Sequence, residues 1–203
     1  MAIIPMTICG IVLCGGKSSR MGTPKALLPF GGETMLERVV GRVLQVVDKV
    51  IVVAAADQAL PDLPDQVTIA RDEASEKGPL EGLRVGLTSL SDGVDAAFAC
   101  SCDLPGIVPD AVRWMIEQLD EQHDIVVPYE GKFHHPLFAV YRRSVVRSIE
   151  QLIDSQRMRP IFLFDEVPTK RIHTDQLLQV DPNLASFENV NTPESYEAAL
   201  KRL

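Results

Sequence analysis

Residues 13–25 read LCGGKSSRMGTPK. The apolar run Ile8–Leu13, which leads into them, predicts a buried β-strand that ends just before the glycine pair. Because glycine has no Cβ, Gly15 and Gly16 allow the backbone to turn sharply and to approach a ligand closely. The stretch therefore predicts a ligand-binding loop at the end of a strand, as expected in an open α/β sheet.

Three cations follow the glycine pair: Lys17, Arg20 and Lys25. Free N–H groups of a glycine-rich loop suit anionic oxygens, so the loop and the cations together indicate a nucleoside triphosphate. The loop matches neither the Walker sequence nor the dinucleotide fingerprint Gly-x-Gly-x-x-Gly. A surface turn with solvated charges is the alternative, but the pattern Arg-Met-Gly-x-x-Lys from Arg20 to Lys25 favours the phosphate loop.

The rest of the chain alternates between short apolar runs and segments with helical spacing. This alternation predicts a mostly parallel, doubly wound sheet in a three-layer α/β/α, Rossmann-like fold. No linker or repeat divides the chain, so residues 1–203 are expected to form a single domain. The expected strands after the first are residues 50–54, 67–70, 96–102, 125–128, 137–141 and 169–173, and the expected helices are residues 34–47, 78–90, 109–122, 144–155, 158–164 and 193–203.

Composition limits the possible partners. The 203 residues carry a net charge of −8, with 46% hydrophobic and 24% charged residues. This charge argues against nucleic acid and anionic membranes, while a small anion can still bind where basic residues concentrate. No apolar stretch reaches the roughly 18 residues of a transmembrane helix. Met1–Leu13 lacks a basic leader and a cleavage site, so a cytoplasmic enzyme is expected.

The four cysteines, Cys9, Cys14, Cys100 and Cys102, fall in or at the ends of expected strands. Because no Cys-x-x-Cys pair occurs, buried reduced thiols are favoured over zinc or a disulfide. At Cys14 we expect the backbone, rather than the sulfur, to face the nucleotide.

Oxygen ligands for a metal are expected beside the phosphate loop. Asp103 follows an apolar strand and precedes a proline-stiffened turn, which suits it to bind Mg²⁺, while capping of that turn is the alternative. Asn191 offers a second oxygen ligand, whereas Asn189 is interpreted as a turn or cap residue. Asp72 ends another strand and is expected to touch the base or ribose, unless it is only a loop acid.

The segment His134-His135-Pro136 connects two expected strands. Adjacent residues on an extended chain point to opposite faces, and neither His123 nor His173 has metal-ligand spacing to them. We therefore expect contact with an acceptor substrate, at His135 and Pro136, rather than a histidine metal site.

Together these groups suit attack by a phosphate oxygen on the α-phosphorus of a nucleotide, with pyrophosphate leaving. Arg20 and Lys25 are expected to stabilise charge on the β- and γ-phosphates, and Mg²⁺ held by Asp103 is expected to bridge the α-phosphate. These three residues are the predicted catalytic residues. The reaction needs no nucleophilic triad.

With these motifs, the chain resembles the molybdenum cofactor guanylyltransferases (MobA) within the larger NTP-transferase group. The glycine loop alone indicates only the broad group, whereas Gly-Pro-Leu-x-Gly and Asn-Val-Asn-Thr-Pro-Glu are more specific. The matching segments cover nearly the whole chain in the family's order: residues 13–22 with Lys25, then 78–83, 102–105, 135–137 and 189–194.

The resemblance implies the nucleotide-diphospho-sugar transferase type of fold. It implies transfer of GMP from GTP to the terminal phosphate of molybdopterin, with GTP on the N-terminal half, the acceptor on the C-terminal half, and Mg²⁺ held at Asp103 with Asn191. Pro24 and residues 54–56 depart from common family residues near the nucleotide. The implied nucleotide contacts are Leu13, Cys14, Gly15, Gly16, Lys25, Asp72, Gly78, Pro79, Leu80, Gly82 and Asp103.

Two alternatives stay open. A sibling enzyme would use CTP with molybdopterin, or a sugar-1-phosphate acceptor, because base choice depends on a few hydrogen bonds from residues 78–82 and Asp72. A noncatalytic nucleotide-binding module is more distant, since it would not need the metal ligands and the leaving-group cations together. Partner proteins from molybdenum cofactor biosynthesis, or molybdoenzymes that receive the product, are possible.

Overall fold

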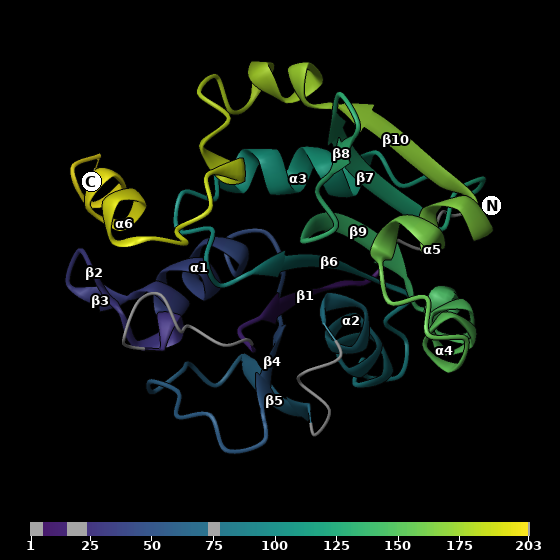
Figure 1. Cartoon of the computed structure of the whole chain (residues 1–203), viewed down its shortest axis with the longest axis horizontal. Coiled ribbons are helices and arrows are strands. Elements are labelled where there is room, and N and C mark those ends of the chain that lie inside the picture. Colours follow the sequence, from purple (N-terminus) through teal and green to yellow (C-terminus); the bar gives the residue numbers. More distant parts are fainter. Residues whose placement is uncertain (1–5, 16–23, 73–77, 203) are drawn as a thin grey trace.

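The computed structural model describes residues 6–15, 24–72 and 78–202. Within them, an eight-stranded sheet has the order β10-β7-β9-β6-β1-β4-β5, with β8 paired to β7 (Figure 1). The strands are β1 (Ile8–Leu13), β4 (Val50–Ala55), β5 (Val67–Asp72), β6 (Ala96–Ser101), β7 (Ile125–Glu130), β8 (Phe133–His134), β9 (Phe138–Arg142) and β10 (Thr169–His173).

The sheet is mostly parallel, as the alternation predicts. β1 lies between β4 and β6 and runs parallel to both. β5 extends the parallel set beyond β4, and β10 pairs in parallel with β7. β9 runs antiparallel to its neighbours β6 and β7. β1, β4 and β6 are almost entirely buried, as expected for strands covered on both faces.

Helices cover both faces of the sheet, so the predicted three layers are confirmed (Figure 1). One core cluster joins Val12 to α1 and α3, and the other joins Ile11 and Leu13 to α2, α4 and α5. Neighbouring residues of β1 thus serve opposite layers, as the period of two in a strand requires. The helices are α1 (Met35–Val43), α2 (Pro79–Thr88), α3 (Pro109–Glu117), α4 (Val146–Asp154), α5 (Pro160–Glu166) and α6 (Pro193–Leu200).

α1 and α3 end about one turn earlier than the hydrophobic spacing predicts. α1 stops at Val43 instead of 47, and tighter three-residue turns follow it, with Gln45 N–H donating to Arg42 O and Val46 N–H to Val43 O. α3 stops at Glu117 instead of 122. Beyond it the Asp120 carboxylate accepts a hydrogen bond from Gln122 N–H, which favours a turn over helix.

A two-stranded hairpin was not expected from the sequence. β2 (Pro29–Phe30) and β3 (Glu33–Thr34) pair antiparallel through Gly31 and Gly32, both with positive φ (65° and 91°). Thr34 also caps α1 in a capping box with Glu37. A small third core, formed by Leu28, Phe30, Met35 and Val190, packs this hairpin against α6.

Two further expectations concern cysteines and membranes. Cys9, Cys14, Cys100 and Cys102 are all buried and free, which confirms the expected buried thiols. Among the described residues, no helix is both long and apolar enough to cross a bilayer.

Candidate functional site

The carboxyl ends of three strands meet at one edge of the sheet. Leu13 lies opposite Ser101 on β6 and Val53 on β4, and Asp72 on β5 lies opposite Ala55. The chain segments that follow β1 and β6 therefore leave the sheet side by side, with the end of β5 at the same edge. Gly15, Asp103 and Asp72 therefore lie at the same edge of the sheet, where ligands bind in open α/β folds. The predicted residues Gly16 and Arg20 lie outside the described residues.

The backbone of Cys14 continues the sheet one residue beyond β1. Its N–H donates to Val53 O at 2.9 Å, and its carbonyl accepts from Gln58 Nε2 at 2.9 Å. The Gln58 side chain also accepts from Ala55 N–H at 3.2 Å, so one amide ties the ends of β1 and β4 together. Gly15, the next residue, is exposed. The phosphate loop therefore leaves the sheet from a fixed point.

Burial disfavours the reactive thiolate form of Cys14. It raises the pKa of the thiol to about 12, and the thiol lies 3.4 Å from Val53 O, to which it donates. A thiol that stays protonated near neutral pH is a poor nucleophile, because the thiolate is the reactive form. The expectation that only the Cys14 backbone faces a ligand is consistent with this arrangement.

The segment Gly-Pro-Leu-x-Gly opens α2 beside β1. Gly78 precedes the helix with φ of 84°, and Pro79 takes the first helical position. A Cβ at Gly82 would meet the Leu13 side chain at 3.2 Å, so this glycine lets α2 lie close to β1. The side chain of Leu80 is fully buried in the core. If Leu80 contacts a nucleotide, it does so through its backbone at the helix N-terminus.

Asp72, at the end of β5, is buried, with only 6% of its surface exposed. Its neighbour Arg71 donates to Ala55 O at 3.0 Å and Gln58 O at 2.8 Å. On α2, Arg84 binds Glu81 through two hydrogen bonds of 2.7 and 3.1 Å. Bonding to Glu81 raises the pKa of Arg84, and the Asp72 carboxylate adds to this effect. The Asp72 carboxylate therefore lies close enough to α2 to stabilise the charge of Arg84.

Lys25, Asp103 and Asn191 converge although they lie far apart in the sequence. Lys25 Nζ donates to Asp103 Oδ2 at 3.0 Å and to Asn191 Oδ1 at 2.5 Å. The side chains of Lys25 and Asp103 are 18% and 17% exposed, so the pair is largely shielded but open to a ligand. A carboxylate and an amide oxygen thus already share one cation, which is the donor chemistry that Mg²⁺ prefers.

Backbone contacts hold this cluster in place. Val190 N–H donates to Asp103 O at 2.8 Å and so ties the end of β6 to the segment before α6. Asn191 N–H and Thr192 N–H both donate to Ser195 Oγ at 3.0 Å. Thr192 caps α6, with Pro193 in the first turn, as expected from the sequence. The cap therefore fixes the residue that presents the amide oxygen.

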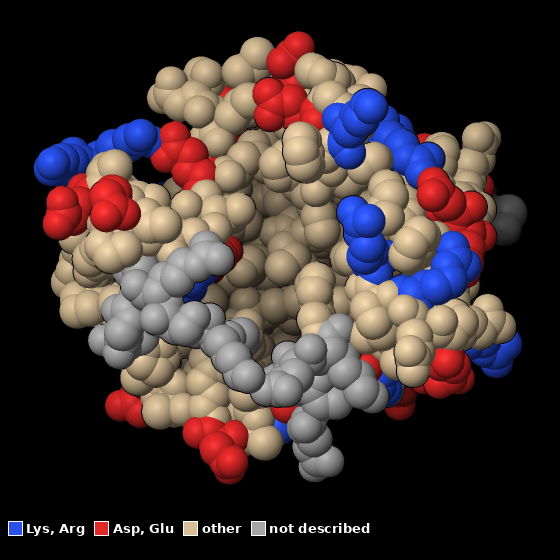
Figure 2. All heavy atoms as spheres, viewed as in Figure 1, with Lys and Arg blue, Asp and Glu red and all other residues tan. Residues whose placement is uncertain are grey.

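A cavity of 240 Å³ opens next to Asp103. The described residues that line it are Ser101, Asp103, Leu104, His134, His135, Pro136, Leu137, Phe138, Phe187 and Asn189. The predicted acceptor residues His135 and Pro136 thus lie beside the predicted metal residue. Figure 2 shows the molecule hollowed at the centre of this face, with Lys and Arg side chains on the rim near β8, β10 and α5.

Both histidines in this cavity have a buried ring nitrogen that no described residue bonds. The Nε2 atoms of His134 and His135 are buried, and within the described part of the chain neither has a hydrogen-bond partner. Burial lowers the pKa of each imidazole, so the neutral form is favoured. The centres of the His135 and Phe187 rings lie 4.6 Å apart. The Tyr141 hydroxyl donates to Pro136 O at 2.7 Å.

The comparison with protein families decides the classification. The MobA-like NTP transferase domain matches residues 10–169. The chain belongs to this family. The resemblance drawn from the motifs is therefore confirmed, and so is the expected class of enzyme, a nucleotidyltransferase.

Relatives of this MobA-like protein span nearly its whole length. A probable molybdenum cofactor guanylyltransferase from Methanosarcina acetivorans is 34% identical and covers 94% of this chain and 88% of its own. The molybdenum cofactor guanylyltransferase of Desulfosudis oleivorans is also 34% identical, and the match covers 95% of this chain and 94% of the relative. The crystal structure of molybdopterin-guanine dinucleotide biosynthesis protein A from Archaeoglobus fulgidus has the same fold, with a TM-score of 0.76. The two chains are 18% identical, and the match covers 97% of this chain and 98% of the other.

Several residues of the site carry no sequence signal. Gln58 lies in a loop, and Tyr141 lies within a strand, so neither stands out before the chain folds. His134 was recognised as part of a pair, but its place in the cavity depends on the pairing of β8 with β7. Asn189, interpreted as a turn residue, also lines the cavity.

Proposed function

We propose that this MobA-like protein transfers GMP from GTP to the terminal phosphate of molybdopterin and releases pyrophosphate. The observation that carries the proposal is the cluster of Lys25, Asp103 and Asn191 at the carboxyl edge of the sheet. It lies between Gly15 at the end of β1 on one side and the cavity with His135 on the other. The names of the relatives point to the same reaction.

GTP is assigned to the side of the site built by β1, β5 and α2. The N–H groups from Gly15 onwards and the N-terminus of α2 at Gly78 favour negative charge. Arg20 is assigned to the same triphosphate. Asp72 is assigned to the base or ribose, because a buried carboxylate beside α2 can accept hydrogen bonds from a nucleotide donor edge.

Asp103 and Asn191 are the residues that would hold Mg²⁺. The ion would neutralise the phosphates and draw charge from the α-phosphate as pyrophosphate leaves. Mg²⁺ keeps several waters and is bound by one or two protein oxygens together with substrate phosphates, which fits the pair of Asp103 and Asn191.

Lys25 has two successive tasks in this proposal. Its ammonium group neutralises Asp103 and bonds Asn191. When a triphosphate arrives, the side chain turns to the phosphates and leaves both oxygens to the metal. It then stabilises charge that develops on the leaving pyrophosphate.

The acceptor is assigned to the cavity of His134, His135 and Pro136. Neutral imidazoles can donate or accept one hydrogen bond at each unpartnered Nε2, which suits a heterocycle rich in amide-like groups. The cavity reaches Asp103, so an acceptor phosphate at its inner end would face the α-phosphate. The four buried free thiols support a reducing compartment, and we place the reaction in the cytoplasm.

Calorimetric titration tests the nucleotide half of the proposal. The protein is titrated with GTP, CTP, ATP and UTP, each with and without Mg²⁺. GTP is expected to bind most tightly, and more tightly with Mg²⁺. A preference for CTP would instead assign the protein to a cytidylyl branch, and binding of no nucleotide would contradict the phosphate loop.

A further inference from the structure

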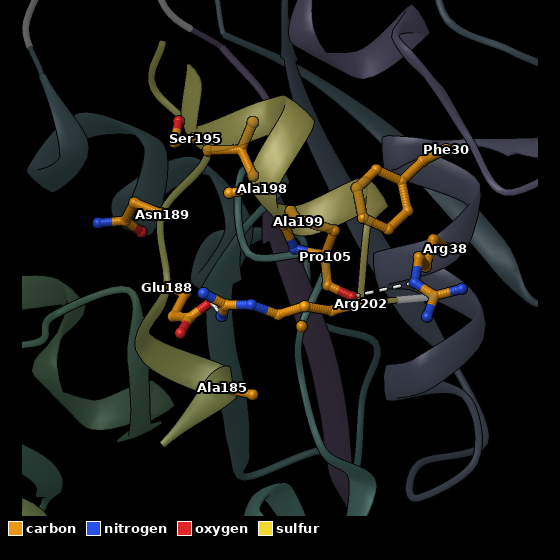
Figure 3. Close-up of a pocket in the computed structure, with 12 residues that line it drawn as sticks. Phe30, Arg38, Pro105, Ala185, Glu188, Asn189, Ser195, Ala198, Ala199 and Arg202 are labelled. Carbon is orange, nitrogen blue, oxygen red and sulfur yellow. Dashed lines mark hydrogen bonds and ion pairs between the residues drawn. The ribbon is translucent and has the colours of Figure 1, made fainter. Parts of the chain in front are cut away.

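A second cavity lies beneath α6, outside the site described above. It measures 460 Å³, which is within the range of small-molecule sites. Its described lining residues are Phe30, Arg38, Pro105, Gly106, Ala185, Glu188, Asn189, Val190, Ser195, Ala198, Ala199 and Arg202. Figure 3 shows Phe30 and Arg38 on one side and Asn189 and Ser195 on the other.

α6 packs only loosely on the rest of the protein, which leaves space beneath it. None of the α6 residues is buried. The helix packs through Tyr196, Ala199 and Leu200 on the small core that includes Phe30 and Val190. Small side chains, Ala198 and Ala199, face the space that remains. This part of α6 is therefore a thin wall rather than part of a filled core.

The opposite wall of the cavity, formed by the turn after β6 and by Arg38 of α1, is closely packed. A Cβ at Gly106 would lie 2.5 Å from Ala185 O, so only glycine lets the turn after β6 approach this segment so closely. Arg38 Nε donates to Pro105 O at 3.1 Å, and its NH1 donates to Glu33 at 3.2 Å. The guanidinium also lies 5.2 Å from the centre of the Phe30 ring. Arg38 is thus fixed in one orientation before any ligand arrives.

Two guanidinium groups line the cavity, and each is paired with a carboxylate, Arg38 with Glu33 and Arg202 with Glu188, so these four charges sum to zero. An anion would therefore bind through the guanidinium N–H groups that the carboxylates leave unused. Arg202 pairs with Glu188 and connects the end of α6 to the segment before Asn191 (Figure 3). The remaining wall is mostly apolar, with one aromatic ring. Such a lining suits a molecule with an apolar body and a carboxylate, sulfonate or phosphate group.

The walls of this cavity are also the supports of the catalytic cluster. Pro105 lies two residues after Asp103, and Val190 immediately precedes Asn191. Val190 N–H donates to Asp103 O at 2.8 Å, so a hydrogen bond joins the two segments directly. Asn189 lines both this cavity and the one with the histidines. A molecule beneath α6 would therefore press on both segments that present oxygens to the metal.

We propose that the cavity beneath α6 is a second ligand site, which binds a small organic anion and thereby changes the affinity of Asp103 and Asn191 for a divalent cation. The first half of this proposal stands on the cavity alone, and the second half rests on the proposed metal site.

The test uses 8-anilinonaphthalene-1-sulfonate, which joins an aromatic body to a sulfonate. Its fluorescence is titrated with and without saturating GTP and Mg²⁺. Ala198→Phe fills the cavity, and Glu197→Phe adds the same ring on the same helix outside the lining. Arg38→Met removes the fixed cation, and Arg42→Met removes a cation of α1 that does not line the cavity. Thermal unfolding confirms that each variant is folded.

We expect saturable one-to-one binding that GTP does not displace. Ala198→Phe and Arg38→Met are each expected to weaken it by about tenfold or more, the effect of roughly 1.4 kcal/mol, while the two controls leave it unchanged. Unaltered binding in both cavity variants, displacement by GTP, or no binding would overturn the site. Mn²⁺ affinity, measured by electron paramagnetic resonance, should shift with dye in the wild type and not in Ala198→Phe. Dye binding without that shift would overturn the coupling and leave the nucleotidyl-transfer proposal untouched.

Discussion

Lys25 Nζ lies 3.0 Å from Asp103 Oδ2, although 78 positions separate the two residues along the chain. The same nitrogen bonds Asn191 Oδ1. A lysine therefore occupies the place where two hard oxygen donors face a common cation. A divalent metal and the Lys25 ammonium cannot both sit there without strong repulsion. Entry of the metal is thus expected to require that Lys25 move to the triphosphate.

Replacing Lys25 by methionine tests this competition. Lys25→Met is expected to raise the affinity for Mn²⁺ without nucleotide by about tenfold or more, since roughly 1.4 kcal/mol of relieved repulsion corresponds to tenfold. The same variant should bind GTP more weakly but guanosine equally well. Mn²⁺ titration by electron paramagnetic resonance measures the first effect. Lys49→Met, which changes an exposed lysine next to β4, is the matched control. Equal Mn²⁺ affinity in all three proteins would contradict the competition.

Asp103 is expected to be needed for turnover but not for folding. Asp103→Asn keeps the size of the side chain and an oxygen for Lys25, while it removes the charge that the metal needs. Turnover should fall by at least about 10²-fold, as is typical when one electrostatic catalytic group is removed. The melting temperature should stay close to that of the wild type. Asp110→Asn, which changes a surface carboxylate paired with Arg113, serves as control. Normal turnover in Asp103→Asn would remove this residue from the metal site.

Tyr141 is expected to position the acceptor loop. Its side chain is fully buried, and its hydroxyl donates to Pro136 O at 2.7 Å. Tyr141→Phe should lower the free energy of unfolding by about 1 kcal/mol, the usual contribution of one hydrogen bond. It should also raise the KM for molybdopterin and leave the KM for GTP unchanged. A purely structural role would instead leave both KM values as they are, with only the stability altered.

The two cavity histidines predict a pH dependence of stability. Burial lowers the pKa of His134 and His135, so the unfolded chain binds their protons more readily than the folded protein does. The free energy of unfolding should therefore decrease as pH falls below the ordinary histidine pKa of about 6.5. Urea unfolding between pH 5 and 8 measures this slope. The double variant His134→Gln/His135→Gln should flatten it, and an unchanged slope would show that the histidines do not cause it.

The sequence predicts the strands of the main sheet far better than it predicts the small hairpin and the helix ends. β1 matches the expected residues 8–13, because an apolar run marks a buried strand clearly. β10 also matches the expected residues 169–173, although Ile172 is its only buried residue. The hairpin of β2 and β3 escapes notice because two residues are too short for any periodicity. Helix ends are also missed, since local turns such as the one at Asp120 end α3 while hydrophobic spacing continues.

The site divides in the same way. Gly15, Lys25, Asp103 and Asn191 are recognisable because each residue type has a specific chemistry at a strand or helix end. The support given by Gln58 and Tyr141 is not recognisable. Gln58 bonds the carbonyl of Cys14, 44 positions away, and Tyr141 bonds that of Pro136 across the turn before β9, and both contacts depend on the folded path of the chain. The cavity beneath α6 likewise depends on how a helix and a hairpin meet.

The most direct test of the central claim is formation of the dinucleotide product. Purified protein is incubated with molybdopterin, Mg²⁺ and either GTP or CTP, and both pyrophosphate and the pterin product are quantified by chromatography and mass spectrometry. We predict one pyrophosphate for each molybdopterin guanine dinucleotide, with GTP strongly preferred and with no product from Asp103→Asn. Tight GTP binding without pyrophosphate release, in the presence of intact molybdopterin, would contradict the account and indicate a nucleotide-binding protein that does not transfer GMP.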